Sequence, residues 1–146
     1  MELIEENELK KEYLNSYRES VRHINRICAE IDEIRILKVS ISVNYDGMPH
    51  GSGQRDLSGY AAKLDGMERE LVKERYNRIR QYLDIAARIK QLKSENEKDV
   101  LFYRYIKGLD WWDIADKLNY SERQIHRLHG KALKNFELPD HVIECQ

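Results

Sequence analysis

Apolar residues recur at alternating steps of three and four over the first 38 residues, and neither proline nor glycine interrupts them. This spacing places the apolar side chains along one face of an α-helix. The sequence therefore predicts a long amphipathic helix over about residues 2–38, with a stripe narrow enough for a coiled-coil partner. The residues of the stripe are Leu14, Tyr17, Val21, Ile24, Cys28 and Ile31, widened by Ile27, Ile34 and Leu37.

The following segment, SISVNYDGMPHGSGQRD, breaks this pattern, because three glycines and a proline fall between Gly47 and Gly53. Such a cluster is typical of a loop, which we expect over residues 39–56. A phosphate-binding P-loop is disfavoured, because it requires a Lys-Ser/Thr pair at the start of the next helix and the segment ends Gln-Arg-Asp.

A second amphipathic helix is predicted over about 57–93, with Asp56 or Ser58 as its cap. Two long helices joined by a loop favour an antiparallel hairpin, which packs against a second copy or against the C-terminal region. The charged stretch from Glu68 to Arg80 alternates in sign, as expected for a solvated, self-paired face. The expected apolar row is Leu57, Ala61, Leu64, Leu71, Ile79, Tyr82, Ala86 and Ile89.

Composition narrows the class of protein. Hydrophobic residues make up 41% and charged residues 35% of the 146 residues, which suits long helices with much surface. Cys28 and Cys145 show no metal-ligand spacing with each other or with histidine, so we expect no metal site. The acidic start and the absence of a long apolar run predict a cytoplasmic protein with no signal peptide and no membrane contact.

Residues 94–138 have a different pattern, and three short helices are expected in them. Ser94 and Glu97 have the spacing of a capping box before an apolar helix (Val100, Leu101, Tyr103, Tyr105, Ile106) that Gly108 closes. The spacing does not decide whether Tyr103 or Tyr105 faces inward. Asp110 is a candidate N-cap of a second helix, whose inward face carries Trp111, Ile114, Ala115 and Leu118. Asn119 can adopt the left-handed conformation that ends a helix.

The last predicted helix, residues 122–134, carries the candidate site. Ser121 and Gln124 form a second capping-box pattern. Long donors in the first turns can read bases, and later cations can meet phosphates, so we predict insertion into a DNA major groove. A net charge of −1 means that any such basic surface is local. The buried face comprises Ile125, Leu128, Ala132 and Leu133, with His129 nearer the core; the candidate DNA-binding residues are Ser121, Arg123, Gln124, His126, Arg127, Lys131 and Lys134.

The spacing of the last two helices also favours a helix-turn-helix, since small Ala115 permits close approach and the connection is about three residues long. The fold expected for the chain is thus all-α: a long antiparallel helical hairpin (1–93), a helix-turn-helix domain (94–138) and a tail (139–146). A plain helical bundle with a basic last helix is the competing interpretation.

The run EKDVLFYRYIKGLDWWDIADKLNYSERQIHRLHGKAL resembles region 4 of bacterial sigma factors. It is similar still more closely to the sigma-like C-terminal domains of phage and prophage transcriptional regulators of the ArpU and RinA type. The resemblance implies an activator of late or packaging-associated genes that acts inside a bacterial cell and uses this module to hold promoter DNA and, in some members, host RNA polymerase. Nothing in the chain resembles the sigma-factor part that binds and melts the −10 element.

Two alternatives remain open: a DNA-packaging component similar to a small terminase subunit, and a sigma-like module that binds RNA polymerase without touching DNA. An enzyme is disfavoured, because Asp110, Asp113 and Asp116 fall where caps and solvated helix faces expect them and no nucleophile accompanies them. We therefore expect double-stranded DNA and a second copy of the chain as partners. No catalytic residue, cofactor or small-molecule substrate is expected.

Overall fold

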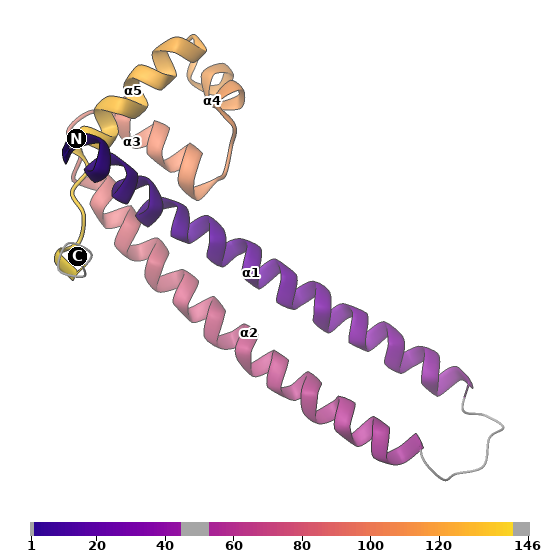
Figure 1. Cartoon of the computed structure of the whole chain (residues 1–146). Helices are drawn as coiled ribbons and strands as arrows, with labels where there is room; N and C mark the ends of the chain where they lie inside the picture. Colours follow the sequence, from indigo (N-terminus) through magenta and orange to yellow (C-terminus); the bar gives the residue numbers. More distant parts are fainter. Residues whose placement is uncertain (1, 45–52, 142–146) are drawn as a thin grey trace. The chain divides into compact units, whose positions relative to one another are not determined.

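A computed structural model describes residues 2–44 and 53–141 (Figure 1), and the regular secondary structure of these residues is helical throughout. The predicted all-α class is confirmed. The elements, in chain order, are α1 (Glu2–Asn44), α2 (Gly53–Lys90), α3 (Glu95–Leu101), the π-helix η1 (Phe102–Ile106), α4 (Trp111–Leu118) and α5 (Glu122–Asn135).

The chain divides into two compact units. One combines residues 1–19 with residues 79–146, and the other comprises residues 20–78. This division differs from the boundary near residue 93 expected from the sequence. The first turns of α1 and the last turns of α2 belong to the same unit as the short C-terminal helices.

In the unit of residues 20–78, the two helical segments run antiparallel (Figure 1). Ile24, Ile27 and Ile31 are buried in a row at steps of three and four, as the sequence predicts for one helix face. Arg35 Nη2 lies 2.6 Å from Glu68 Oε1, joining the two segments by an ion pair. Both side chains are largely exposed, so the apolar row contributes more to the pairing than this ion pair does.

Both long helices extend into the predicted loop. Helix α1 continues to Asn44 rather than ending near residue 38, and α2 begins at Gly53 rather than near residue 57. Residues 45–52 of the predicted loop lie outside the described residues. A glycine in a helix costs about 1 kcal/mol relative to alanine. This cost does not prevent α2 from forming, although the helix contains Gly53, Gly59 and Gly66.

The apolar row expected along the second helix is wrong in part. Ile89 is buried, but Ile79 and Tyr82 are exposed and Ile85 is buried instead. The error arises because α2 has two apolar rows, and steps of three and four fit either of them. On α1, Leu37 is likewise exposed rather than buried.

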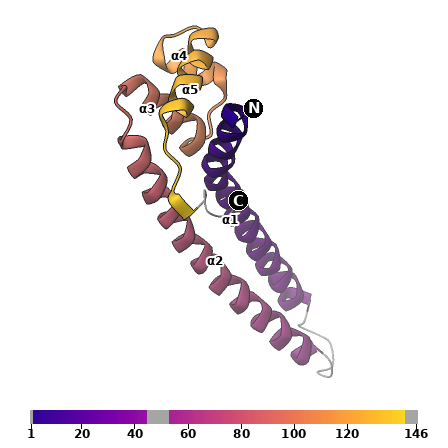
Figure 2. The ribbon, with the colours of Figure 1, turned by 60° about the vertical axis from the view of Figure 1, so that its left-hand side comes forward.

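The other unit has its core among the short helices. Val100, Ile114, Ala115 and Ile125 form a buried cluster, on which partly buried side chains including Trp111 pack. Figure 2 shows α4 and α5 crossing beside α3. The small side chain of Ala115 lies in this cluster, as expected for a close crossing of two helices.

The π-helix η1 changes the phase of the helix before the turn. Its wider turn is closed by a 3.1 Å bond from Lys107 N–H to the Phe102 carbonyl. Tyr105 is buried, while Tyr103 is partly buried against the core cluster. Gly108 follows with φ 70°, the left-handed conformation that glycine adopts without strain.

Candidate nucleic-acid interface

Three local signals set the geometry of α4 and α5, and all three occur where the sequence predicts them. Asp110 caps α4, with its Oδ1 accepting from Asp113 N–H at 2.8 Å. Asn119 ends α4 in the left-handed region (φ 58°). Ser121 caps α5. The short connection between the two helices is therefore defined at both ends by side-chain caps and by a left-handed residue.

The capping box at the start of α5 is complete. Ser121 Oγ accepts from Gln124 N–H at 3.2 Å, and Gln124 Oε1 accepts from Ser121 N–H at 2.9 Å. The same Oε1 lies 3.2 Å from Ser121 Oγ. A bidentate contact with adenine requires the amide oxygen of glutamine, which is already engaged here. Gln124 can keep its cap or read adenine with both amide groups, but one arrangement excludes the other.

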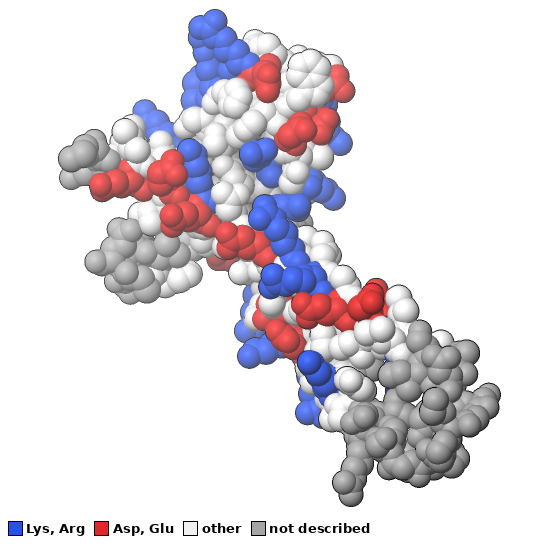
Figure 3. All heavy atoms as spheres, turned by 45° about the vertical axis from the view of Figure 1, so that its right-hand side comes forward, with Lys and Arg blue, Asp and Glu red and all other residues white. Residues whose placement is uncertain are grey.

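Four cations lie on the outward side of α5. Arg123, Arg127, Lys131 and Lys134 are all exposed, and at 100° per residue they fall within an arc of about 80°. The buried residues Ile125, Ala132 and Leu133 lie on the opposite side of the helix. Figure 3 shows one face of the molecule, where lysine and arginine atoms gather on the C-terminal helices beside a smaller group of aspartate and glutamate atoms.

Along one edge of this row is a shallow hollow of about 180 Å³. It lies between the turn and α5 and is lined by Tyr120, Gln124, Arg127, Leu128 and Lys131. The cationic row therefore borders a small recess that contains both polar and apolar side chains.

His126 lies at the flank of the row rather than within it. Its ring centroid is 4.7 Å from that of Trp111, whose other contacts include the Arg104 guanidinium at 4.3 Å. Arg104 in turn donates to the Leu109 carbonyl at 3.1 Å. His126 is exposed at its outer side and packed on Trp111 at its inner side, so it can reach a ligand only from the edge of α5.

His129 is buried, as its position nearer the core predicts, and it has a buried polar partner. Its Nε2 lies 2.7 Å from the Tyr105 hydroxyl oxygen, a hydrogen bond that either tautomer of a neutral imidazole can make. Burial, together with the nearby Lys11, Arg104 and His126, lowers the pKa of His129 to about 4. Burial also raises the pKa of Tyr105 to about 12. Both groups are neutral near pH 7.

Helix α4 exposes an acidic face. Repulsion from Asp110 raises the pKa of the Asp113 carboxyl, with further contributions from desolvation, its hydrogen bond to Asp110 and repulsion from Asp116. Trp112 stands beside these carboxylates with 71% of its surface exposed. This face would repel phosphate, so the side of the module that is favourable to nucleic acid is the outward side of α5.

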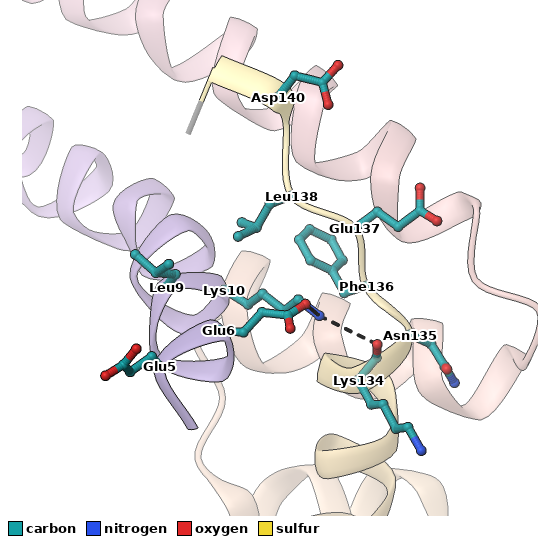
Figure 4. A pocket seen from close by; sticks show the side chains of 10 residues that line it. All are labelled: Glu5, Glu6, Leu9, Lys10, Lys134, Asn135, Phe136, Glu137, Leu138 and Asp140. Carbon is teal, nitrogen blue, oxygen red and sulfur yellow. Dashed lines mark hydrogen bonds and ion pairs between the residues drawn. The ribbon is translucent and has the colours of Figure 1, made fainter. Parts of the chain in front are cut away.

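The C-terminal end of α5 is held by a residue from the start of the chain. Lys10 is only 4% exposed, and its ammonium donates to the Leu133 carbonyl at 2.8 Å. It also pairs with Glu6 at 3.0 Å (Figure 4). The last carbonyls of a helix have no partner within the helix and carry partial negative charge, so a buried cation there is favourable. A cavity of about 720 Å³ opens beside this contact.

Sequence reasoning missed this contact, and it misassigned part of the first capping box. Ser94 does accept from Glu97 N–H, but the Glu97 side chain does not return to Ser94. It is buried and accepts instead from Asn135 Nδ2, at 3.2 and 3.3 Å to its two oxygens. Local spacing cannot reveal a partner 38 residues away.

Comparison with known proteins gives one family. A family model described as "Protein of unknown function (DUF1492)" matches residues 39–137, more than half of the chain. The chain belongs to the DUF1492 family. The match covers α2 and all the short helices, including the cationic row of α5, whereas Lys10 lies outside it. No curated protein and no solved structure matches the chain.

Among residues 2–44 and 53–141, no group of histidine, cysteine, aspartate and glutamate is placed to hold a metal ion. Within the same ranges, no helix has the length and apolar character needed to cross a membrane.

Proposed function

We propose that this DUF1492 protein binds double-stranded DNA sequence-specifically, with α5 in the major groove, and regulates transcription. The observation that carries the proposal is the row of four exposed cations on α5, opposite its buried face. A helix that enters a groove needs donors that face outward while its other side is fixed in a core. The resemblance of residues 97–133 to sigma region 4 and to ArpU- and RinA-type regulators supports this function.

Each residue has a separate role in the proposal. Arg123 and Arg127 read base edges, because they project from the first two turns of α5. Lys131 and Lys134 bind phosphates further along the backbone. Ser121 fixes the start of the helix, Gln124 contributes through its free amide nitrogen while its oxygen keeps the cap, and His126 contacts the groove from the edge.

The test begins with the selection of bound duplexes from a random pool. Against the recovered site, Arg127→Ala should lose about 1–3 kcal/mol of binding free energy and some base preference. Lys134→Ala should weaken binding to all sequences and reduce the slope of log K against log salt by about 1. Lys98→Ala on α3, where the lysine pairs with Glu95, is the matched control and should leave both quantities unchanged.

Recovery of no preferred sequence, together with affinity that does not change with salt, would contradict the proposal. A palindromic site would in addition support the homodimer expected from the sequence. A closed ring of many copies in solution would favour the packaging component instead.

One observation favours a second candidate, a sigma-like module that binds RNA polymerase without DNA contact. Exposed tryptophans are frequent anchors of protein interfaces, and Trp112 stands on an acidic face of α4. Under this candidate, Trp112→Ala would abolish binding to purified polymerase, and the α5 variants would leave it unchanged.

A further inference from the structure

The small hollow at the edge of the cationic row of α5 has a lining that contains no acidic residue. Its volume is about 180 Å³, and it lies between the turn and α5. Two of its lining residues, Arg127 and Lys131, are exposed cations that make no ion pair with a described residue. The other three, Tyr120, Gln124 and Leu128, decide which kind of ligand the hollow fits.

The capping box leaves Gln124 with donors alone to offer a ligand. Its Oε1 accepts from Ser121 N–H at 2.9 Å and lies 3.2 Å from Ser121 Oγ. A backbone N–H can only donate, so this bond fixes which end of the amide is the oxygen. The amide nitrogen makes no hydrogen bond with a described residue. An acceptor in the hollow can therefore bind Gln124 without breaking the cap of α5.

Tyr120 lines the hollow from the turn before α5, where three contacts fix it. Its N–H donates to the Ala115 carbonyl at 3.0 Å, and its side chain packs against the buried cluster. Asn96 Nδ2 donates to its hydroxyl oxygen at 3.1 Å. The hydroxyl hydrogen has no acceptor among the described residues. Tyr120 is thus held in place with one donor available to a ligand.

This lining fits a phosphate group that carries a sugar. Phosphate oxygens are negatively charged and only accept, and the polar side chains around the hollow offer donors and two positive charges. Leu128 and the ring of Tyr120, both partly buried, add an apolar wall. A free phosphate ion has nothing to place against such a wall, whereas a nucleic-acid backbone brings the carbon atoms of its sugar. The lining therefore favours a backbone phosphate over the free ion.

The position of the hollow on α5 indicates the same ligand. At 100° per residue, Gln124 and Leu128 lie about 20° and 60° beyond Lys131, which forms one edge of the cationic row. A helix with its side chains is about 10–12 Å wide, and the major groove is about 12 Å wide. When the centre of the row faces the base edges, the flank of α5 faces the wall of the groove, which is the phosphate backbone.

We propose that this hollow binds one backbone phosphate of duplex DNA, with Tyr120, Gln124 and Lys131 donating to its oxygens. The inference rests on the proposed function, because it requires α5 in the major groove. It adds Tyr120 to the DNA-binding residues and assigns the amide nitrogen of Gln124 to the backbone. Arg127, which lies nearer the centre of the row, remains available to a base.

The test uses the full chain and the duplex recovered by selection, with single phosphates replaced in turn by uncharged methylphosphonates. Replacement of the phosphate at the hollow should weaken binding of the parent chain by about tenfold. Tyr120→Phe, which removes only a hydroxyl, should weaken binding to the unmodified duplex by roughly threefold to tenfold. It should cause a clearly smaller loss on the duplex modified at that one phosphate, because the contact is already weakened there.

A second variant separates binding from folding. Gln124→Glu keeps an acceptor for the capping box but replaces the amide donor by a negatively charged oxygen. The melting temperature should stay the same or rise, since glutamate suits both a capping box and the start of a helix. Affinity for the unmodified duplex should fall by about tenfold or more. Tyr76→Phe, which removes an exposed hydroxyl on α2, is the matched control for Tyr120→Phe and should change neither quantity.

The outcomes distinguish this inference from the proposed function. Sequence-specific binding that Tyr120→Phe and Gln124→Glu leave unchanged would overturn the inference alone. An equal loss from Tyr120→Phe on every modified duplex would also overturn it, because the hydroxyl would then act through the fold. Failure to bind any duplex would contradict the proposed function and the inference together. Calorimetric binding of inorganic phosphate by such a chain, abolished by Lys131→Ala, would assign the hollow to a free phosphate instead.

Discussion

His129 makes stability depend on pH. Its pKa is lowered from 6.5 to about 4 in the folded chain, so the unfolded chain binds more protons between these two values. The free energy of unfolding should therefore be highest above about pH 6.5 and fall as the pH is lowered towards 4. The loss attributable to this group is on the order of 3 kcal/mol.

The measurement is urea unfolding at a series of pH values, for the parent chain and for His129→Gln. Carboxylates titrate in both proteins, so the difference between the two curves isolates the imidazole. The free energy of unfolding of the parent chain minus that of His129→Gln should decrease as the pH falls from 6.5 to 4. Two parallel curves would show that His129 does not carry the dependence.

The sequence predicts the orientation and contacts of some individual residues but not of others. The outward orientation of Arg123 and Arg127 follows from helix periodicity alone, and both are exposed as that periodicity requires. The engagement of Gln124 Oε1 follows from its capping-box spacing. The role of Lys10 could not be predicted, because a lysine near the end of a solvated helix carries no signal of a buried acceptor elsewhere.

Among the helices, the start of α5 is set by one hydroxyl. Ser121→Ala removes the acceptor for Gln124 N–H and should lower the free energy of unfolding by about 1 kcal/mol. Ser121→Asn, which keeps an acceptor at the N-cap, is the control and should retain most of that stability. Thermal melting followed by circular dichroism compares the two. Equal losses in both variants would show that the cap is not the source of the effect.

Helix boundaries were predictable where they depend on neighbours in sequence and not where they depend on length. Asp110, Asn119 and Ser121 were found from local rules, because each makes its bonds within a few residues. The distal ends of α1 and α2 were not, because glycine and β-branched residues lower helix propensity without ending a helix. The π-helix η1 could not be predicted from the spacing of apolar residues, because a single π-turn has no spacing of its own in the sequence.

At the scale of the whole molecule, the two compact units should differ in local stability. Among the residues of the unit 20–78 whose side chains the structure describes, the buried apolar ones are few: Ile24, Ile27 and Ile31. The other unit has most of the core, including Leu14, Leu101 and Phe136. Regions with little buried apolar surface open at lower free energy.

Hydrogen-exchange mass spectrometry measures this difference. Peptides from residues 59–78 should exchange faster than peptides from residues 97–134, in proportion to the smaller core around them. Uniform protection along the chain would show that the two units unfold together.

The sequence predicted an all-α hairpin with a helix-turn-helix but not how the chain divides into units. Periodicity assigns each helix a buried face without naming what covers it. The first turns of α1 therefore appeared to belong with the hairpin, although Tyr13 packs on Phe136 and Arg18 donates to the Ile106 carbonyl. Contacts of this range depend on the three-dimensional arrangement of helices, which one sequence does not encode in any local pattern.

The bond between Lys10 and the Leu133 carbonyl joins positions 123 residues apart, and this separation sets an order of events during synthesis. At about 5–20 residues per second, a ribosome takes roughly 6–25 s to make the chain between them. The segment of residues 20–78 emerges complete within that interval and can pair as a hairpin first. Lys10 therefore remains exposed to water until α5, which carries its acceptor, has been synthesised.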